Sequence, residues 1–150
     1  MVILTYPSQA GGFNIGHHVT LALLSDPTFT VSVLVRNSST STYPSGCKIV
    51  KISDDPDKSE LVTAFRGQDA IICARNFKHK ATEKDAIDAA IEAGVKRFIP
   101  SEYGLNNTNP AARALSPVFD IKGHHIEYLK SKESTGLTWT AVATGLWLDW

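Results

Sequence analysis

The sequence predicts an α/β fold: a doubly wound parallel sheet of about six strands with helices on both faces. Short apolar or β-branched runs alternate with amphipathic segments along the chain, as in sheets whose parallel strands are joined by crossover helices. A glycine-rich stretch follows the first run and precedes a helical pattern. The chain has 150 residues and is 43% hydrophobic, which suits a single domain covering residues 1–150.

Six runs predict the strands, because each is short, apolar and often rich in β-branched residues. The run TVSVLV at 30–35 has this pattern most clearly. Several runs are followed by Gly, Pro, Asn or Ser, which favour turns. The expected strands are residues 2–5, 30–35, 47–52, 69–74, 95–100 and 138–145.

The segments between these runs carry apolar residues at helical spacing. In the clearest segment, Thr82 and Asp85 have the spacing of a capping box, and Gly94 stands where helices often stop. We therefore expect a helix that begins at Thr82 and stops at Gly94. The other expected helices are residues 14–24, 59–65 and 118–130, whereas residues 37–46 and 106–117 are expected to be loops.

The stretch AGGFNIG at 10–16 lies where dinucleotide-binding folds place a glycine-rich loop. Its glycines allow a tight turn, and the helix expected from Asn14 offers free N–H groups to an anion. A bulky Phe13 stands where a loop that contacts a pyrophosphate favours glycine. The stretch alone therefore leaves two interpretations open, dinucleotide binding and a plain glycine-rich turn.

Charge and cysteine content narrow the classes of partner and compartment. The formal net charge is +0, so we expect no attraction to nucleic acid or to an anionic membrane. No apolar stretch approaches the roughly 18 residues of a membrane span, and the first residues lack the basic region of a signal peptide. Cys47 and Cys73 are expected to be free thiols. The sequence thus predicts a cytoplasmic protein.

Two histidine pairs, His17–His18 and His124–His125, raise the question of a metal site. Adjacent residues of a helix point about 100° apart, so neither pair has the spacing of metal ligands. We expect ordinary surface or helix-face histidines and no metal.

At AGVKRFIPSEYGLN, residues 93–106, the sequence resembles the NmrA-like group of atypical short-chain dehydrogenases, close to the isoflavone reductases and phenylcoumaran benzylic ether reductases. Residues 31–39, 86–98 and 119–150 resemble other segments of the same family. The resemblance covers nearly the whole chain. It implies a Rossmann-like, NAD(P)-binding fold and a reductase that acts on a small, aromatic or apolar molecule.

Two features depart from the family pattern. Family members are about twice as long, so we expect the chain to lack most of their C-terminal substrate portion. The apolar end, GLWLDW at 145–150, predicts a homo-oligomer or a partner that covers it. The family's G-x-x-G-x-x-G positions fall on Ala10, Phe13 and Gly16, unless a local shift places Gly12 in the second role.

Arg36 is the candidate for the adenosine end of a dinucleotide. It follows Gly16 by 20 residues, where an acidic residue would bind the ribose of NAD and an arginine the 2′-phosphate of NADP. No Asp or Glu lies between Thr30 and Asp54, which favours NADPH over NADH. A solvated arginine at a strand end is the alternative interpretation.

The remaining cofactor path follows the carboxyl ends of the strands. Arg75 is bulkier than the family's usual residue after the fourth strand, and the residues after the fifth strand border the family's nicotinamide pocket. For Glu102 we favour a structural role, as a loop cap or a partner of Arg97, over catalysis. The expected cofactor-binding residues are Gly11, Gly12, Phe13, Asn14, Ile15, Gly16, Arg36, Ala74, Arg75, Ser101, Glu102, Tyr103 and Lys122.

Lys122 is the expected catalytic residue. At helical spacing it falls within an inward stripe that contains Val118, Phe119, Ile126 and Leu129. A lysine there snorkels, finds a partner or lines a cleft, and burial lowers its pKa toward the range of acid–base work. The family's active-site lysine aligns here, which implies contact with the nicotinamide ribose and a general acid–base role. Val118 replaces the tyrosine of the ordinary Tyr-x-x-x-Lys pair, which leaves the proton donor open.

Three hypotheses about function follow. The favoured one is an NADPH-dependent oxidoreductase of the isoflavone reductase-like type, acting on a small-molecule substrate that the sequence does not identify. A non-catalytic, NAD(P)-sensing NmrA-like regulator would keep Arg36 without needing Lys122. A cofactor-free isomerase, cyclase or lyase would use the Lys122 cleft after Phe13 and Arg75 had filled the cofactor groove.

Overall fold

The structure, a computed structural model, describes residues 1–5, 15–74 and 82–146. Its sheet has six strands, all parallel, in the order β3-β2-β1-β4-β5-β6. The order reverses between β1 and β4, the switch point beside which Rossmann-like folds bind their ligands. The strands are β1 (Val2–Thr5), β2 (Val31–Arg36), β3 (Lys48–Ile52), β4 (Ala70–Cys73), β5 (Arg97–Ile99) and β6 (Thr138–Trp139).

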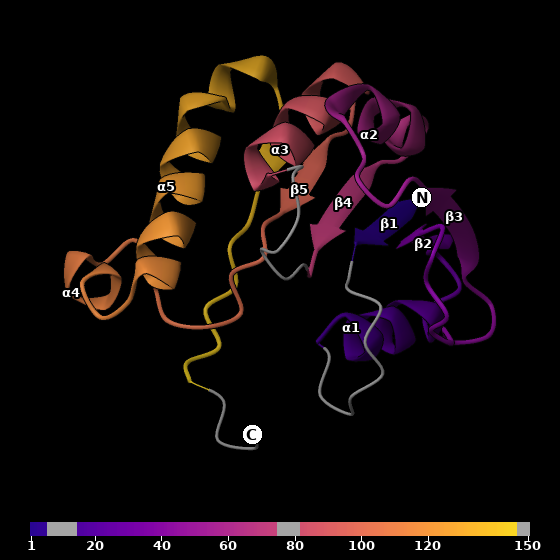
Figure 1. The fold of residues 1–150 in the computed structure, drawn as a ribbon, viewed down its shortest axis with the longest axis horizontal. Helices are drawn as coiled ribbons and strands as arrows, with labels where there is room; N and C mark the ends of the chain where they lie inside the picture. Colours follow the sequence, from indigo (N-terminus) through magenta and orange to yellow (C-terminus); the bar gives the residue numbers. More distant parts are fainter. Residues whose placement is uncertain (6–14, 75–81, 147–150) are drawn as a thin grey trace.

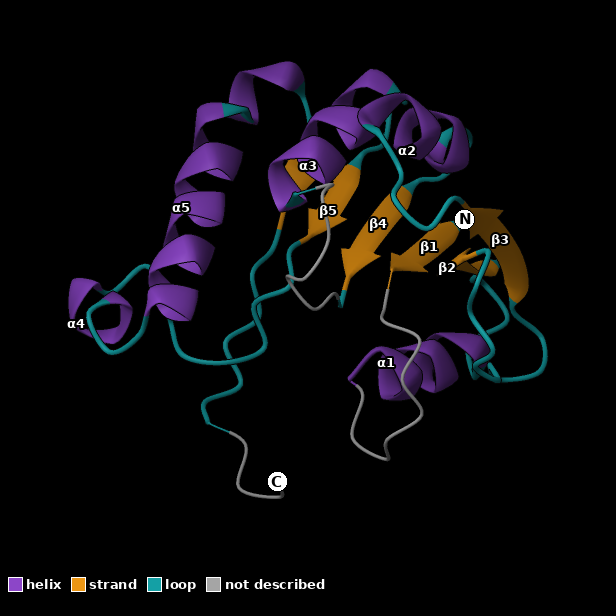
Figure 2. Cartoon of the chain, viewed as in Figure 1, coloured by secondary structure: helices purple, strands orange, loops and turns teal. Residues whose placement is uncertain are grey.

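Helices cover both faces of this sheet, as the sequence predicts (Figure 1). One helix, α1, lies on one face, whereas α2, α3 and α5 lie on the other (Figure 2). None of the helices in the described part of the chain is long and apolar enough to cross a membrane. The helices are α1 (Ile15–Leu24), α2 (Lys58–Phe65), α3 (Glu83–Glu92), α4 (Pro110–Arg113) and α5 (Pro117–Ser131), and the 3-10 turn η1 (Glu133–Thr135) follows.

Two hydrophobic clusters hold the layers together. Side chains alternate along β2, so that Val31, Val33 and Val35 pack toward α1 while Leu34 packs toward α2 and α3. Burial of these side chains on both faces is what makes the strand a nearly continuous apolar run in the sequence. Phe98 of β5 is fully buried in the larger cluster, beneath α2, α3 and α5.

The ends of α3 agree with the sequence. The Thr82 hydroxyl accepts a hydrogen bond from Asp85 N at 3.3 Å, and the Asp85 carboxylate accepts one from Thr82 N at 2.8 Å. This reciprocal pair is the predicted capping box. Gly94 follows the helix with a φ of 77°, a left-handed conformation that glycine adopts without steric cost.

Two predicted elements differ from the structure. Residues 106–117 are not entirely loop, because α4 forms there, with Asn109 as its N-cap and Pro110 in its first turn. The sixth strand was expected over 138–145 but ends at Trp139. Pro100 explains the short strand: it follows the last residue of β5 and has no N–H to continue the ladder with β6.

The buried face of α5 also differs from the expected stripe. Ile126 and Leu129 are buried as predicted, but Val118 at the start of the helix is 48% exposed. His125 is buried instead of lying on the surface. Its Nδ1 lies 3.6 Å from Glu83 Oε2, so an imidazole and a carboxylate meet where α5 packs on α3.

We predict that Phe98→Ala lowers the free energy of unfolding by about 3–5 kcal/mol, because it leaves a cavity in the larger cluster. Phe29→Ala removes the same atoms from a side chain that is 43% exposed, and should cost less than about 1 kcal/mol. Urea unfolding followed by circular dichroism measures both values. Equal losses would contradict the burial that separates the two phenylalanines.

His125 predicts a second property, a loss of stability in acid. Burial, together with the positive charges of Lys84, His124 and Lys122, lowers the pKa of His125 to about 4, although the Glu83 carboxylate faces it. A group whose pKa is lower in the folded state stabilises the protein above its unfolded pKa, about 6.5 for histidine. That contribution is lost as the pH falls toward 4, by at most about 1.4 kcal/mol per pH unit.

His125→Asn removes this titration, so its unfolding free energy should fall less steeply between pH 7 and pH 4 than that of the wild type. His17→Asn, at an exposed histidine, is the matched control and should keep the wild-type slope. Urea titrations at several pH values supply the slopes. Parallel curves for His125→Asn and the wild type would refute the assignment.

Candidate active site

A turn at Ser101–Gly104 forms the centre of the candidate site, at the carboxyl end of β5. The Ser101 N–H donates to Glu83 Oε1 at 2.8 Å. The Tyr103 N–H donates to the Val142 carbonyl at 3.0 Å, and the Gly104 carbonyl accepts from Gly145 N, also at 3.0 Å. The turn is therefore bound to the start of α3 and to the segment after β6.

Tyr103 has a φ of 37°, a left-handed conformation that is uncommon for a residue with a side chain. Its side chain packs against the α1-side cluster that includes Ala74, at the end of β4. Burial, together with Cys73 and Glu83, raises the pKa of Tyr103 well above its usual value. The phenol therefore keeps its proton at neutral pH and is a donor, not a base.

Lys122 reaches this turn from α5. Its ammonium group donates a hydrogen bond to the backbone carbonyl of Glu102. Burial lowers the pKa of Lys122, and the negative charges of Glu102 and Glu83 act in the opposite direction. A half-buried amine with a lowered pKa, held by a hydrogen bond, is suited to hold or release a proton.

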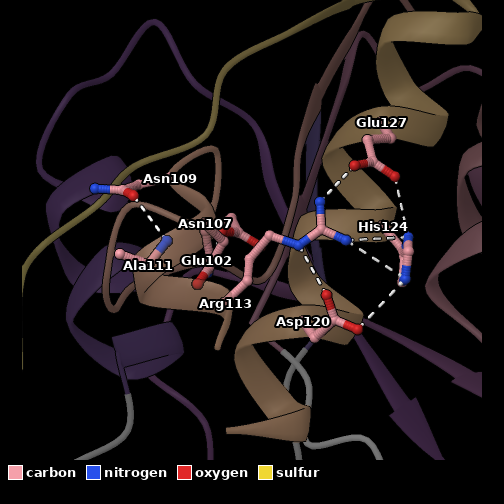
Figure 3. A network of polar contacts seen from close by, with 8 residues as sticks. All are labelled: Glu102, Asn107, Asn109, Ala111, Arg113, Asp120, His124 and Glu127. Atoms are coloured by element: carbon pink, nitrogen blue, oxygen red, sulfur yellow. Dashed lines mark hydrogen bonds and ion pairs between the residues drawn. The ribbon is translucent and has the colours of Figure 1, made fainter. Parts of the chain in front are cut away.

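Glu102 is a buried carboxylate. It is 2% exposed, and the Asn107 side-chain amide donates to its Oε2 at 2.7 Å (Figure 3). Burial raises the pKa of Glu102, and the Asn107 hydrogen bond and the Lys122 charge oppose that shift. Arg97, the partner considered from the sequence, instead donates to Thr140 Oγ1 at 2.9 Å. The contacts of Glu102 thus fit a loop-fixing role through Asn107.

Arg36 ends β2 and begins a compact turn on the other side of the switch point. The Ser39 N–H donates to the Arg36 carbonyl at 3.0 Å, and the Asn37 N–H donates to the last carbonyl of β3 at 2.8 Å. The Ser38 N–H donates to Asp54 Oδ1 at 3.0 Å. Hydrogen bonds from Ser38, together with the Arg36 charge, hold the pKa of Asp54 below its usual range. These contacts give the turn one defined shape.

The structure brings only part of the predicted cofactor path into view. Gly11, Gly12, Phe13, Asn14 and Arg75 lie outside the described residues. Ile15 and Gly16 open α1, and the Gly16 carbonyl accepts from Thr20 Oγ1 at 2.7 Å.

The predicted site residues separate into two groups at one edge of the sheet. Ala74, Ser101, Glu102, Tyr103 and Lys122 come together around the ends of β4 and β5. Arg36 lies apart from them, at the end of β2.

Four residues of the site were missed in the sequence. Glu83 and His125 had an available signal: Glu83 lies inside the predicted capping box, and His125 follows Lys122 by one helical turn. Asp54 had none, because its contact with Ser38 forms only when separate segments meet. Asn107 had none, because its contact with Glu102 depends on the path of the loop that carries both residues. Within residues 1–5, 15–74 and 82–146, no group of three His, Cys, Asp or Glu side chains is arranged to hold a metal ion.

The sequence and the fold of this chain are similar to those of known proteins. The model of the NmrA-like family matches residues 10–149. An oxidoreductase of Aspergillus flavus, aprR, is 43% identical over 150 residues, which is 99% of this chain and 50% of that protein. The chain thus spans about half the length of the curated relatives it matches.

Solved structures agree on the fold. The crystal structure of an isoflavone reductase is 27% identical with a TM-score of 0.67, over 95% of this chain and 48% of the other. A leucoanthocyanidin reductase–NADPH complex from Vitis vinifera is 19% identical with a TM-score of 0.68, over 95% and 47%. With a family match over nearly its whole length and a close fungal relative, this chain belongs to the NmrA-like family.

Proposed function

We propose that the chain is the nucleotide-binding part of an NADPH-dependent oxidoreductase of the isoflavone reductase-like type, which reduces a small aromatic or apolar molecule. The observation that carries the proposal is the Lys122 ammonium, fixed on the Glu102 carbonyl at the carboxyl end of β5. The oxidoreductase named among the relatives and the NADPH complex among the solved structures support the same class.

Arg36 would hold the 2′-phosphate of NADPH, because it is the cation at the end of β2, where this fold meets the adenosine ribose. The beginning of α1 would favour the pyrophosphate through its N–H groups and the positive end of its dipole. NADPH supplies the hydride when bound. The residues of the chain bind and orient it.

Lys122 would hold a proton at its Nζ for the reacting group of the substrate. The buried carboxylates of Glu102 and Glu83 keep the ammonium form available, whereas burial eases loss of the proton. Tyr103 lies on the same turn and its phenol keeps its proton, but the hydroxyl is buried. The substrate-binding site would be completed by the half of the relatives' length that this chain does not cover.

Compartment and assembly belong to the same proposal. We infer a cytoplasmic protein, with neither nucleic acid nor membrane as partner. We also infer a homo-oligomer, or a partner segment against the chain's end, where Val142 is 42% and Leu146 is 65% exposed. Size-exclusion chromatography with light scattering measures the assembly.

Arg36→Ala should weaken NADPH binding by roughly 10–100-fold and leave NADH binding within about 2-fold, because a charged hydrogen bond to the phosphate is lost. Arg66→Ala, an exposed arginine at the end of α2, is the matched control and should bind both nucleotides as the wild type does. Isothermal titration calorimetry measures the six affinities, those of the wild type and the two variants for each nucleotide. Absence of binding of either nucleotide to the wild type would leave the cofactor-free enzyme as the better hypothesis.

Lys122→Met keeps the length of the side chain and removes its proton. With an isoflavone as substrate, NADPH oxidation should fall by about 100-fold or more, the usual contribution of a general acid or base. Lys130→Met, at an exposed lysine of the same helix, should retain wild-type turnover. If a protein of the relatives' full length binds NADPH but reduces no aromatic substrate, the regulator becomes the favoured function.

A further inference from the structure

Residues 101–116 run from the end of β5 to the start of α5, and we call them the strap. The strap carries the turn Ser101–Gly104 at its beginning and α4 near its end. It is fastened to α5 at both places. The first fastening is the Lys122 hydrogen bond to the Glu102 carbonyl, and the second is made by Arg113 of α4.

The guanidinium of Arg113 lies along one face of α5, where it meets three polar side chains (Figure 3). Nε donates to Asp120 Oδ1 at 2.8 Å, and Nη1 donates to the Glu127 carboxylate. Nη2 lies 3.3 Å and 3.4 Å from the two ring nitrogens of His124. The Arg113 side chain is only 19% exposed, whereas its carboxylate partners Asp120 and Glu127 are 49% and 57% exposed. The guanidinium is therefore the enclosed member of a cluster whose carboxylates face solvent.

Gly123 leaves the space on α5 that the Arg113 side chain occupies. A Cβ at this position would lie 2.5 Å from Arg113 Nε, 2.6 Å from Cδ and 2.8 Å from Cζ. Glycine inside a helix is about 1 kcal/mol less favourable than alanine, and here it lets the arginine cross the helix in contact with its backbone. The notch at Gly123 is specific to this arginine, because all three atoms that the Cβ would meet first belong to Arg113.

The two contacts that fasten the strap to α5 lie at adjacent residues of that helix. Lys122 and Gly123 are neighbours on α5, so the helix receives the first and the last part of the strap on successive residues. Between them, Asn107 ties the strap to its own beginning through the Glu102 carboxylate. Release of Arg113 would therefore free the stretch that holds Glu102, whose carbonyl binds the Lys122 ammonium.

We propose that Arg113, seated in the notch at Gly123, is a positioning residue that keeps the Glu102 carbonyl on the Lys122 ammonium and keeps water away from it. This inference rests on the proposed role of Lys122, but its test needs neither nucleotide nor substrate. Failure to bind NADPH would overturn the proposed function and leave this inference standing.

The test is competitive acetylation of the folded chain over a range of pH, with the Lys122 peptide quantified by mass spectrometry. Arg113→Met removes the clamp. Gly123→Ala displaces it while keeping every charge and improving the helix propensity of α5. In both variants the midpoint of Lys122 labelling should move up by about half a pH unit or more, because water reaches the amine and its lowered pKa returns toward the usual value.

Lys132→Met is the matched control. Lys132 also bridges α5 to another helix, with its Nζ 3.1 Å from Asp88 Oδ1 of α3, but it does not contact the strap. Its loss should leave the Lys122 midpoint unchanged. Arg113→Lys retains the charge without the planar fork and should give a midpoint between those of the wild type and Arg113→Met.

Amide hydrogen exchange of the same variants separates positioning from simple structural support. Exchange in residues 105–113 should rise by roughly tenfold in Arg113→Met and Gly123→Ala. Faster exchange with an unchanged Lys122 midpoint would overturn the proposal, because the clamp would then hold the strap alone. If Arg113→Met does not fold, Gly123→Ala and Arg113→Lys decide the outcome by the same midpoint.

Discussion

The candidate site depends on the backbone conformation of one short turn, Ser101–Gly104. Its polar groups are bound by three separate elements: Glu83 of α3, Lys122 of α5 and the segment after β6. Each hydrogen bond contributes only about 1 kcal/mol to stability, but together they select one conformation. Tyr103 keeps a left-handed conformation only where its surroundings determine it. The hydrogen bonds to these three elements supply those surroundings.

The same turn explains why titratable groups are buried at the edge of the sheet. Lys122 and Glu102 are each pushed toward their neutral forms by burial, and each opposes that shift in the other. Apolar side chains in their place would hold the layers together at least as well, since burying charges is costly. Perturbed groups gathered where parallel strands end are typical of functional sites. Stability alone does not account for them.

Most of the fold could be predicted because strand and helix periodicity is carried by neighbouring residues. The length of β6 could not, since it depends on Pro100, which follows the adjacent strand β5. Nor could α4, because its four residues are too few for a period. In the site, Lys122 follows from helical spacing and position. The partnership of Asn107 with Glu102 depends on the path of the strap, which no local pattern records.

The separation of Arg36 from Lys122 bears on the proposed cofactor. Arg36 ends β2 and Lys122 contacts the turn that follows β5, and β1 and β4 lie between these strands. Three steps between neighbouring strands, at about 4.8 Å each, separate the two ends by roughly 14 Å. The switch point lies in the middle of that interval, where dinucleotides cross such sheets. A mononucleotide confined to one half would need only one of the two groups, so their joint presence favours a ligand with two halves.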